Sequence, residues 1–278
     1  MLAWKQRCCK GCIKCVDTNN IPFIPYDKGR KTLMEYLTPL SFLIISFIYS
    51  SVGLGGGSSY TAIMAITGVS YHIIPSVSLT LNLLVTFFGM VNFWRFGYVR
   101  YSLVIPFIIT SVPLAYFAGS IKLNESIFEF ILLLSLIAIA TRIYILNDLV
   151  LSIQLTKIQK WSLIIFIGSS LGFVAGAIGI GGGIYLIPLI IMLGLGTEKE
   201  AAAAGSIFVW SNSLAGLAPR YQFLRFEYDV LLPSILSVLI GGSLGSYFGA
   251  TKYDPQTIQK VMGIVIILAI LFLMRKIF

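Results

Sequence analysis

The sequence predicts an all-α integral membrane protein with about eight transmembrane helices, arranged as two internal repeats that each begin with a glycine-broken helix. Two observations lead to this fold class. Hydrophobic residues make up 57% of the 278 residues and charged residues 11%, with a mean hydropathy of +0.90, far from the composition of soluble domains. Glycine clusters at residues 53–57 (GLGGG) and 179–183 (GIGGG) interrupt two long apolar runs. Runs of this length favour helices over a transmembrane barrel, whose strands are short and alternating.

The first apolar segment, residues 37–69, contains the first glycine cluster. A continuous helix of that length would reach about 50 Å, beyond a hydrocarbon core of about 30 Å. We therefore expect two shorter pieces, and the sequence leaves open whether they cross as one broken span or fold back as a hairpin. Three further spans follow, at residues 71–96, 101–120 and 126–146.

The second half repeats this plan after a linker at residues 147–160. A broken segment covers residues 161–195, and spans follow at residues 201–219, 228–250 and 257–274. Glycines and prolines match between the halves, for example Gly68 with Gly194 and Pro106 with Pro233. We expect one transmembrane transporter domain, residues 36–278, made of repeat 1 (37–146) and repeat 2 (161–278). Four crossings in each half would make the repeats parallel, whereas hairpins would leave three and invert them.

Basic residues at alternate loops favour eight crossings in the inner membrane with both termini cytoplasmic. These residues are Arg95, Arg100, Lys157, Lys160, Arg220, Arg225, Arg275 and Lys276. Anchoring of the topology is the default interpretation of the four loop arginines, and attraction of anions into a vestibule is the alternative.

The basic tail at residues 1–35 carries all four cysteines: Cys8, Cys9, Cys12 and Cys15. No second Cys/His cluster follows to complete a metal site. We interpret the segment as a cytoplasmic tail whose reduced cysteines are candidates for acylation, with metal binding as the alternative.

The glycine breaks indicate where a ligand binds. A freed backbone group at membrane depth costs several kcal/mol unless it is buried in protein or lines a polar cavity. Paired, glycine-interrupted segments at matching positions of two halves are typical of a transporter's binding site. Half-helices that begin after such a break present free N–H groups and a positive dipole end, which suits an anion.

The two broken segments and the residues after them, GLGGGSSYTAIMAITGVS and GFVAGAIGIGGGIYLIPLIIMLGLGTEKEAAAAGSIFVWSNSLAG, resemble the TauE/SafE family of anion transporters, the sulfite exporter type. The resemblance covers roughly residues 37–278. The first half departs from the family with PSVSLTLN, where a small-Gly-Thr-Ser stretch is usual, so symmetric use of the two half-sites is in doubt. The resemblance implies a multi-pass inner-membrane exporter or permease for small sulfur-containing or organic anions, such as sulfite and sulfonates.

The candidate substrate-binding residues are neutral, because acidic and basic residues lie at or near span ends. They comprise the glycines of both breaks and polar or aromatic residues near them: Gly53, Gly55, Gly56, Gly57, Ser58, Ser59, Asn82, Gly179, Gly181, Gly182, Gly183, Ser206, Trp210 and Asn212. Close helix packing is the alternative role for the glycines, and interhelical hydrogen bonding is the alternative for the serines and asparagines. We expect no catalytic residue, no metal ligand and no cofactor.

Two other function classes compete with transport. A membrane-embedded enzyme needs a nucleophile with a base, or a carboxylate pair, inside the bilayer, and the spans hold neither. A structural subunit would gain nothing from paired glycine breaks. The expected partners are a small anion and the lipid bilayer, without nucleic acid, and a homo-oligomer is compatible with the sequence. Without an intramembrane carboxylate, facilitated diffusion or coupling through protonation of the substrate is favoured.

Overall fold

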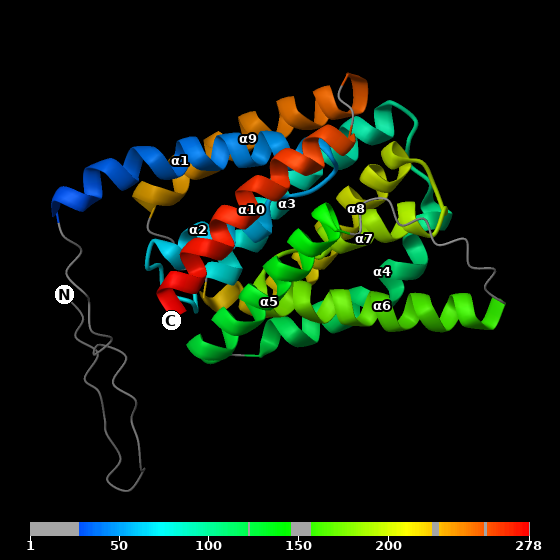
Figure 1. Cartoon of the computed structure of the whole chain (residues 1–278), viewed down its shortest axis with the longest axis horizontal. Coiled ribbons are helices and arrows are strands. Elements are labelled where there is room, and N and C mark those ends of the chain that lie inside the picture. Colours follow the sequence, from blue (N-terminus) through cyan, green and yellow to red (C-terminus); the bar gives the residue numbers. More distant parts are fainter. Residues whose placement is uncertain (1–27, 122, 146–156, 224–227, 253–254, 278) are drawn as a thin grey trace, which may run out of the picture.

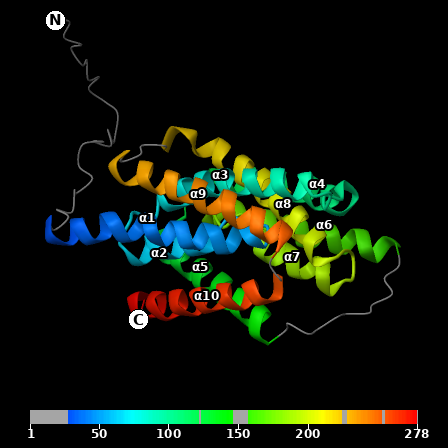
Figure 2. The same ribbon diagram turned by 90° about the horizontal axis from the view of Figure 1, so that it is seen from above.

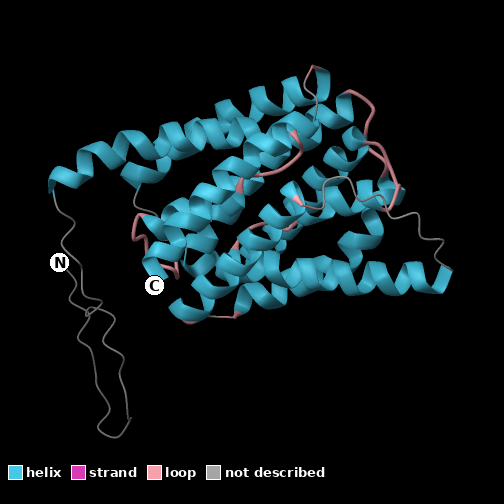
Figure 3. Ribbon diagram, viewed as in Figure 1, coloured by secondary structure: helices cyan, strands magenta, loops and turns pink. Residues whose placement is uncertain are grey.

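A computed structural model describes residues 28–121, 123–145, 157–223, 228–252 and 255–277. The part of the chain that it describes is helical throughout, without a strand, and short loops join the helices (Figure 3). The elements are α1 Lys28–Ser51, α2 Gly57–Ile66, α3 Ile74–Arg95, α4 Tyr101–Ser120, α5 Glu125–Tyr144, α6 Lys157–Ile178, α7 Gly183–Met192, α8 Glu198–Leu217, the 3₁₀-helix η1 Ala218–Phe223, α9 Tyr228–Thr251 and α10 Pro255–Ile277. The cysteine tail and most of the linker between the halves lie outside the described residues.

The helices form a membrane bundle, as the sequence predicts. Helices α3, α4, α8 and α9, together with the Trp161–Ile178 part of α6, are long and apolar enough to cross a bilayer. Large apolar side chains on the outside of the bundle remain exposed, including Phe166 (72%), Ile109 (66%) and Phe130 (65%). Outward apolar side chains of this size suit a lipid environment. The all-helical fold class is confirmed, and both predicted breaks are present.

Each broken segment folds back on itself. The ring of Tyr60, near the start of α2, lies 4.8 Å from the ring of Phe42, two turns before the end of α1. The hydroxyls of Ser59 and Tyr49 are 2.7 Å apart. In the second half, Gly182 packs against Leu171 and Ala175 of α6. We call α1 with α2 the first hairpin and α6 with α7 the second hairpin, and their tips are residues 52–57 and 179–183.

Glycines at every fourth position bring one helix of each half close to a helix of the other. Along α9, Gly241 meets Leu43 of α1 and Gly249 meets Ser51, so these two helices run parallel. Such small residues permit close backbone contact in membranes. In the same way, the α6 glycines at positions 168, 172 and 176 follow α4 from Phe107 to Ala115 in parallel.

The remaining contacts fix the direction of the repeats. Helices α3 and α8 are antiparallel, because Gly89 meets Ser206 while Gly216 meets Leu79. Helix α9 is parallel to α3, with Gly242 beside Val85 and Ser246 beside Asn92. Helix α4 is parallel to α8, with Arg100, just before α4, beside Glu200 and Gly119 beside Gly216. Helix α1 therefore runs opposite to α6, and the two halves are inverted repeats. Figures 1 and 2 show α1 and α6 starting at opposite ends of the bundle.

The fold-back changes the topology drawn from loop charges. Each half contributes one hairpin and three further long helices. Helix α1 begins at the same end of the bundle at which α10 ends (Figure 1). The sequence also predicts both termini on one side. Arg95 at the end of α3 and Lys157 at the start of α6 lie at the opposite end. Straight crossings would have put these basic residues at the same end as the termini.

Candidate functional site

Both hairpin tips end at a glycine in the left-handed region, from which the short returning helix starts. Gly56 has φ 90° and caps α2, and Gly182 has φ 76° and caps α7. Neither cap provides a side-chain hydrogen bond to the first turn. The first N–H groups of a helix have no partner within it. The third residue of each helix donates its N–H to the cap carbonyl, Ser59 to Gly56 at 3.0 Å and Tyr185 to Gly182 at 3.2 Å. Each tip therefore keeps the first two N–H groups of its helix as buried donors at the positive end of a helix dipole.

The two tips meet at the centre of the bundle. A methyl group added at Gly57 would lie 2.8 Å from the carbonyl oxygen of Gly179 and 2.9 Å from that of Ile180. All residues of both tips are buried. Hairpins that enter from opposite ends thus contact each other directly, and side chains larger than hydrogen are excluded at the contact.

A serine from the opposite half holds each tip. Ser78 of α3 donates to the carbonyl oxygen of Gly179 at 2.8 Å. Ser206 of α8 donates to the carbonyl oxygen of Gly53 at 3.2 Å. The backbone of each tip also packs against a helix of the opposite half, since Gly53 contacts Ala202 and Gly179 contacts Pro75. The backbone contacts thus follow the pseudo-twofold relation between the halves, whereas Ser206 lies one position past Gly205, the residue that matches Ser78.

The side chains facing the tips differ between the halves. In the first, Gly55 and Gly57 both face the amide of Asn82 in α3. In the second, the equivalent glycines, Gly181 and Gly183, both face Val209 of α8. An amide in one half thus occupies the place of an isopropyl group in the other. The segment PSVSLTLN, which departs from the family pattern, ends at Asn82 and therefore contains this difference.

Several buried polar atoms of α3 and α8, the two helices that face the tips, have no hydrogen-bond partner. These are the oxygen of the Asn82 amide, both polar atoms of the Asn212 amide, and the hydroxyls of Ser76 and Ser213. Each of these residues is at most 1% exposed. Unpartnered groups of this kind cost about 1–3 kcal/mol each. Two of them lie at the tips, the Asn82 oxygen at Gly55 and the Ser213 hydroxyl at Gly181, where a polar ligand would satisfy them.

Arg220 is buried at the same place, although its position after an apolar run suggested a loop anchor. Its guanidinium donates to the carbonyl oxygens of Gly176 and Ala177, the last turn of α6 before the second tip. Among the residues that the structure describes, Arg220 is the only charged residue that is buried. The expectation of a site lined only by neutral groups is therefore incomplete.

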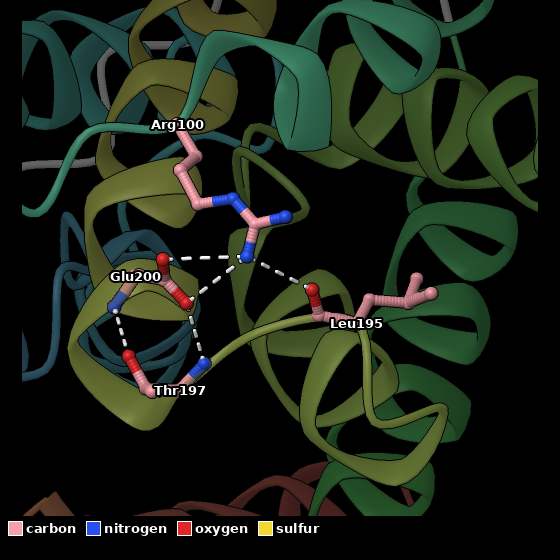
Figure 4. Close-up of polar contacts among 4 residues, drawn as sticks. All are labelled: Arg100, Leu195, Thr197 and Glu200. Carbon is pink, nitrogen blue, oxygen red and sulfur yellow. Dashed lines mark hydrogen bonds and ion pairs between the residues drawn. The ribbon is translucent and has the colours of Figure 1, made fainter.

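Arg100 lies at one end of the bundle, outside the site. Figure 4 shows its guanidinium 3.3 Å from a carboxylate oxygen of Glu200 and within reach of the carbonyl oxygen of Leu195. Glu200 also accepts from the backbone N–H of Thr197, whose hydroxyl caps α8 in return. Since Glu200 balances its charge, Arg100 supports the anchoring interpretation better than the vestibule.

The structure brings most of the sequence-predicted residues together. The break glycines are buried in the tips, and Asn82 and Ser206 are buried beside them. Asn212 is also buried, in α8. Ser58 and Ser59 instead contact Tyr49 inside the first hairpin. Trp210 is half-buried and is not among the groups closest to the tip glycines. The roles of all these residues stay predictions.

Sequence reasoning missed four residues of the site: Ser78, Val209, Ser213 and Arg220. The three uncharged residues lie at helical spacing from residues that were predicted. Ser78 is one turn before Asn82 in α3, and Val209 and Ser213 are one and two turns after Ser206 in α8. Arg220 gave one signal, since it directly follows an apolar span in the sequence GLAPR.

Comparisons with known proteins agree with this architecture. The model of the family described as sulfite exporter TauE/SafE matches residues 39–273. The chain is similar to the "Probable membrane transporter protein y4hK" of Sinorhizobium fredii, with 29% identity over 83% of this chain and 94% of the relative. It is also similar to the Bacillus subtilis proteins "Probable membrane transporter protein YjnA", with 26% identity over 82% and 94%, and "Probable membrane transporter protein YunE", with 25% identity over 81% and 92%. No solved structure matches the chain.

Proposed function

The chain belongs to the TauE/SafE sulfite exporter family of membrane transporters, and from this premise we propose that it carries small sulfur-containing or organic anions, such as sulfite and sulfonates, out of the cell. Family membership confirms a transporter in place of an enzyme. We place the protein in the inner membrane, with the end that holds both termini in the cytoplasm, because the tail is rich in Lys and Arg.

We propose that the anion binds where the two hairpin tips meet, once the tips separate from the close contact at Gly57. The observation that carries this assignment is the meeting of two buried hairpin tips beside the unpartnered hydroxyl of Ser213, which faces Gly181. Helix starts attract anions through their free N–H groups and dipole. Arg220 adds a buried positive charge one turn before the second tip. No buried carboxylate among the described residues opposes an anion there.

The inverted hairpins suggest how access alternates. One hairpin enters from each end of the bundle, and the two tips meet at the anion site proposed above. Withdrawal of the first hairpin would open the site toward one side of the membrane, and withdrawal of the second would open it toward the other. Such rocking of one repeat against the other around a fixed site is common in transporters with inverted repeats.

Ser213→Ala tests the site with little disturbance to the fold. Replacing an unpartnered buried hydroxyl leaves the stability of the ligand-free protein unchanged or slightly higher. Loss of a hydrogen bond to a charged ligand is worth about 1.5–3 kcal/mol, so we expect sulfite affinity to fall at least about tenfold. The measurements are binding of sulfite to purified protein and sulfite flux in proteoliposomes, with taurine as a second probe.

Ser111→Ala is the matched control. Ser111 also has a buried hydroxyl without a partner, but it lies in α4 against Gly172, away from the tips. We expect its substitution to leave sulfite binding unchanged. If Ser213→Ala retains full affinity, or if both variants lose it equally, the proposed anion site is wrong.

A further inference from the structure

We propose that Asn82 makes the anion site selective for anions that carry a hydrogen-bond donor of their own. Sulfite is then bound in its protonated form, hydrogen sulfite. Sulfonates with a hydroxyl or ammonium group meet the same requirement, whereas purely alkyl sulfonates do not. This selectivity, which rests on the proposed function, narrows the substrate class of the same site.

The Asn82 amide is held in one orientation where the tips meet. Its nitrogen donates to the carbonyl oxygen of Gly179 at 3.3 Å and lies against Gly57, while its oxygen lies against Gly55. The reversed amide would place its oxygen beside the Gly179 carbonyl oxygen, with no hydrogen atom between them. The carbonyl of the second tip therefore determines that the amide presents its oxygen to the first tip at Gly55.

The oxygen of this amide is an acceptor without a donor. The Asn82 side chain is fully buried, and within the described part of the chain no hydrogen bond reaches its oxygen. An amide oxygen has two lone pairs and no proton to give. An anion whose exposed atoms are all acceptors would leave this oxygen unpaired and would repel it. A ligand with an O–H or N–H group supplies the missing donor.

Asn82 and Ser213 approach the same glycine of the second tip from two helices. A methyl group added at Gly181 would lie 3.1 Å from the Asn82 nitrogen and 3.5 Å from the Ser213 hydroxyl oxygen. The Ser213 hydroxyl also has no partner. It can donate to an oxygen of the anion while the Asn82 oxygen accepts a proton from the ligand. A ligand that is both acceptor and donor satisfies the two side chains together.

The charge around the tips favours the same form of the ligand. Among the described residues, Arg220 alone is both charged and buried, and it lies one turn before the second tip. Its single positive charge balances one negative charge. Hydrogen sulfite carries one negative charge and sulfite carries two, so sulfite would leave an unbalanced charge buried, which is costly.

The second half lacks the acceptor. Val209 matches Asn82 in the repeat, and it faces Gly181 and Gly183 as Asn82 faces Gly55 and Gly57. An apolar side chain at this position is therefore compatible with the backbone of a tip. Asn82→Val copies the second half and removes the acceptor with little risk to folding.

Three sulfonates of equal sulfonate charge test the selectivity by their binding to purified full-length protein. Propane-1-sulfonate, 2-hydroxyethanesulfonate and taurine differ chiefly in a terminal methyl, hydroxyl or ammonium group. A site that hydrogen-bonds a ligand hydroxyl rejects the analogue without it, so we expect the hydroxyl and ammonium compounds to bind at least about tenfold more tightly than propane-1-sulfonate. Asn82→Val should bind all three equally.

Ser78→Ala is the matched control. It removes the other side-chain bond to the Gly179 carbonyl and leaves the Asn82 oxygen in place. We expect it to keep the preference for a donor, even if the tips become less stable. A preference lost equally in Ser78→Ala and Asn82→Val would belong to the packing of the tips and would overturn the role of the Asn82 oxygen.

Sulfite provides a second test, because its second proton dissociates near neutral pH. The affinity for total sulfite should rise as the pH falls through that range, while the affinity for 2-hydroxyethanesulfonate, which does not titrate there, should stay constant. The titratable side chains on the buried or half-buried stretches around Asn82 are Tyr49, Tyr60, Tyr185 and Arg220. Neither tyrosine nor arginine titrates near neutral pH, so the change belongs to the ligand.

The outcomes separate this selectivity from the proposed function. Equal binding of the three sulfonates by the unmodified protein, a preference that survives in Asn82→Val, or sulfite affinity that does not change with pH would overturn the selectivity and leave the anion site standing. If neither sulfite nor any of the sulfonates binds, the proposed function fails and the selectivity fails with it.

Discussion

The first hairpin lines its interior with hydroxyl groups, whereas the second hairpin has aliphatic or aromatic residues at the same positions. Ser58, Ser59 and Thr61 of α2 correspond to Ile184, Tyr185 and Ile187 of α7. The backbones nevertheless match, with left-handed glycines at the same caps. Inversion thus supplies two matching tips, and the side chains give each its own chemistry: hydroxyl groups on one side and aliphatic or aromatic groups on the other.

A second difference between the halves concerns Arg220, and here it is the second half that carries the polar residue. It braces the end of α6 below the second tip, whereas the equivalent residue of the first half is the buried Phe93. A fixed positive charge therefore accompanies only the apolar hairpin.

The largest expected difference between the tips concerns Gly57→Ala and Gly183→Ala. A methyl group at Gly57 would meet two backbone carbonyl oxygens and the amide of Asn82, whereas one at Gly183 would meet chiefly the side-chain ends of Val209 and Leu54. Side-chain ends can move and backbone carbonyls of packed tips cannot. We expect Gly57→Ala to cost about 3 kcal/mol or more and Gly183→Ala about 1 kcal/mol.

The measurement is the yield of monodisperse protein and its unfolding in detergent. Equal losses for the two variants would mean that the tips are packed with the same rigidity, against the structure. A stable Gly57→Ala protein would show that the first tip has room for a side chain.

A smaller effect is expected at Arg220. Arg220→Met removes two charge-assisted bonds to the last carbonyls of α6, for about 2 kcal/mol of stability, and lowers sulfite affinity because the buried positive charge is lost. Arg220→Lys keeps the charge but cannot bind both carbonyls as a planar fork. It should recover much of the sulfite affinity and little of the stability. If lysine restores neither quantity, or methionine leaves affinity intact, the charge has no part in anion binding.

The fold could be predicted from sequence where apolar length and glycine content decide it. Both breaks, the repeat and most helix positions follow from those two features. The fold-back could not be derived, because the direction of the chain after a glycine break depends on tertiary contacts such as that between Phe42 and Tyr60. The charge pattern of the loops then gave a different topology, since it was counted over straight crossings.

The candidate site, too, could be predicted from the sequence only in part. The tip glycines were recognisable because clustered glycine is unfavourable in a helix. Ser78 and Ser213 were not, because single serines are common in membrane helices and only the opposing tip distinguishes these two. Arg220 became identifiable only once α6, 43 residues earlier in the chain, was seen to end beside it.

The smallest effect is expected at the end of the bundle, where Arg100 and Glu200 form an ion pair with side-chain exposures of 51% and 21%. Exposed pairs of this kind contribute about 0–1 kcal/mol and are screened by salt. A double-mutant cycle with Arg100→Gln and Glu200→Gln should give a coupling below about 1 kcal/mol at low salt, with little remaining at high salt. Glutamine at position 200 can still cap α8, so the cycle isolates the charge. Sulfite flux should be nearly unchanged in both variants, because Arg100 is balanced by Glu200 and lies away from the tips. A large loss of flux in Arg100→Gln with normal stability would instead make this arginine part of the anion's route and restore the vestibule interpretation.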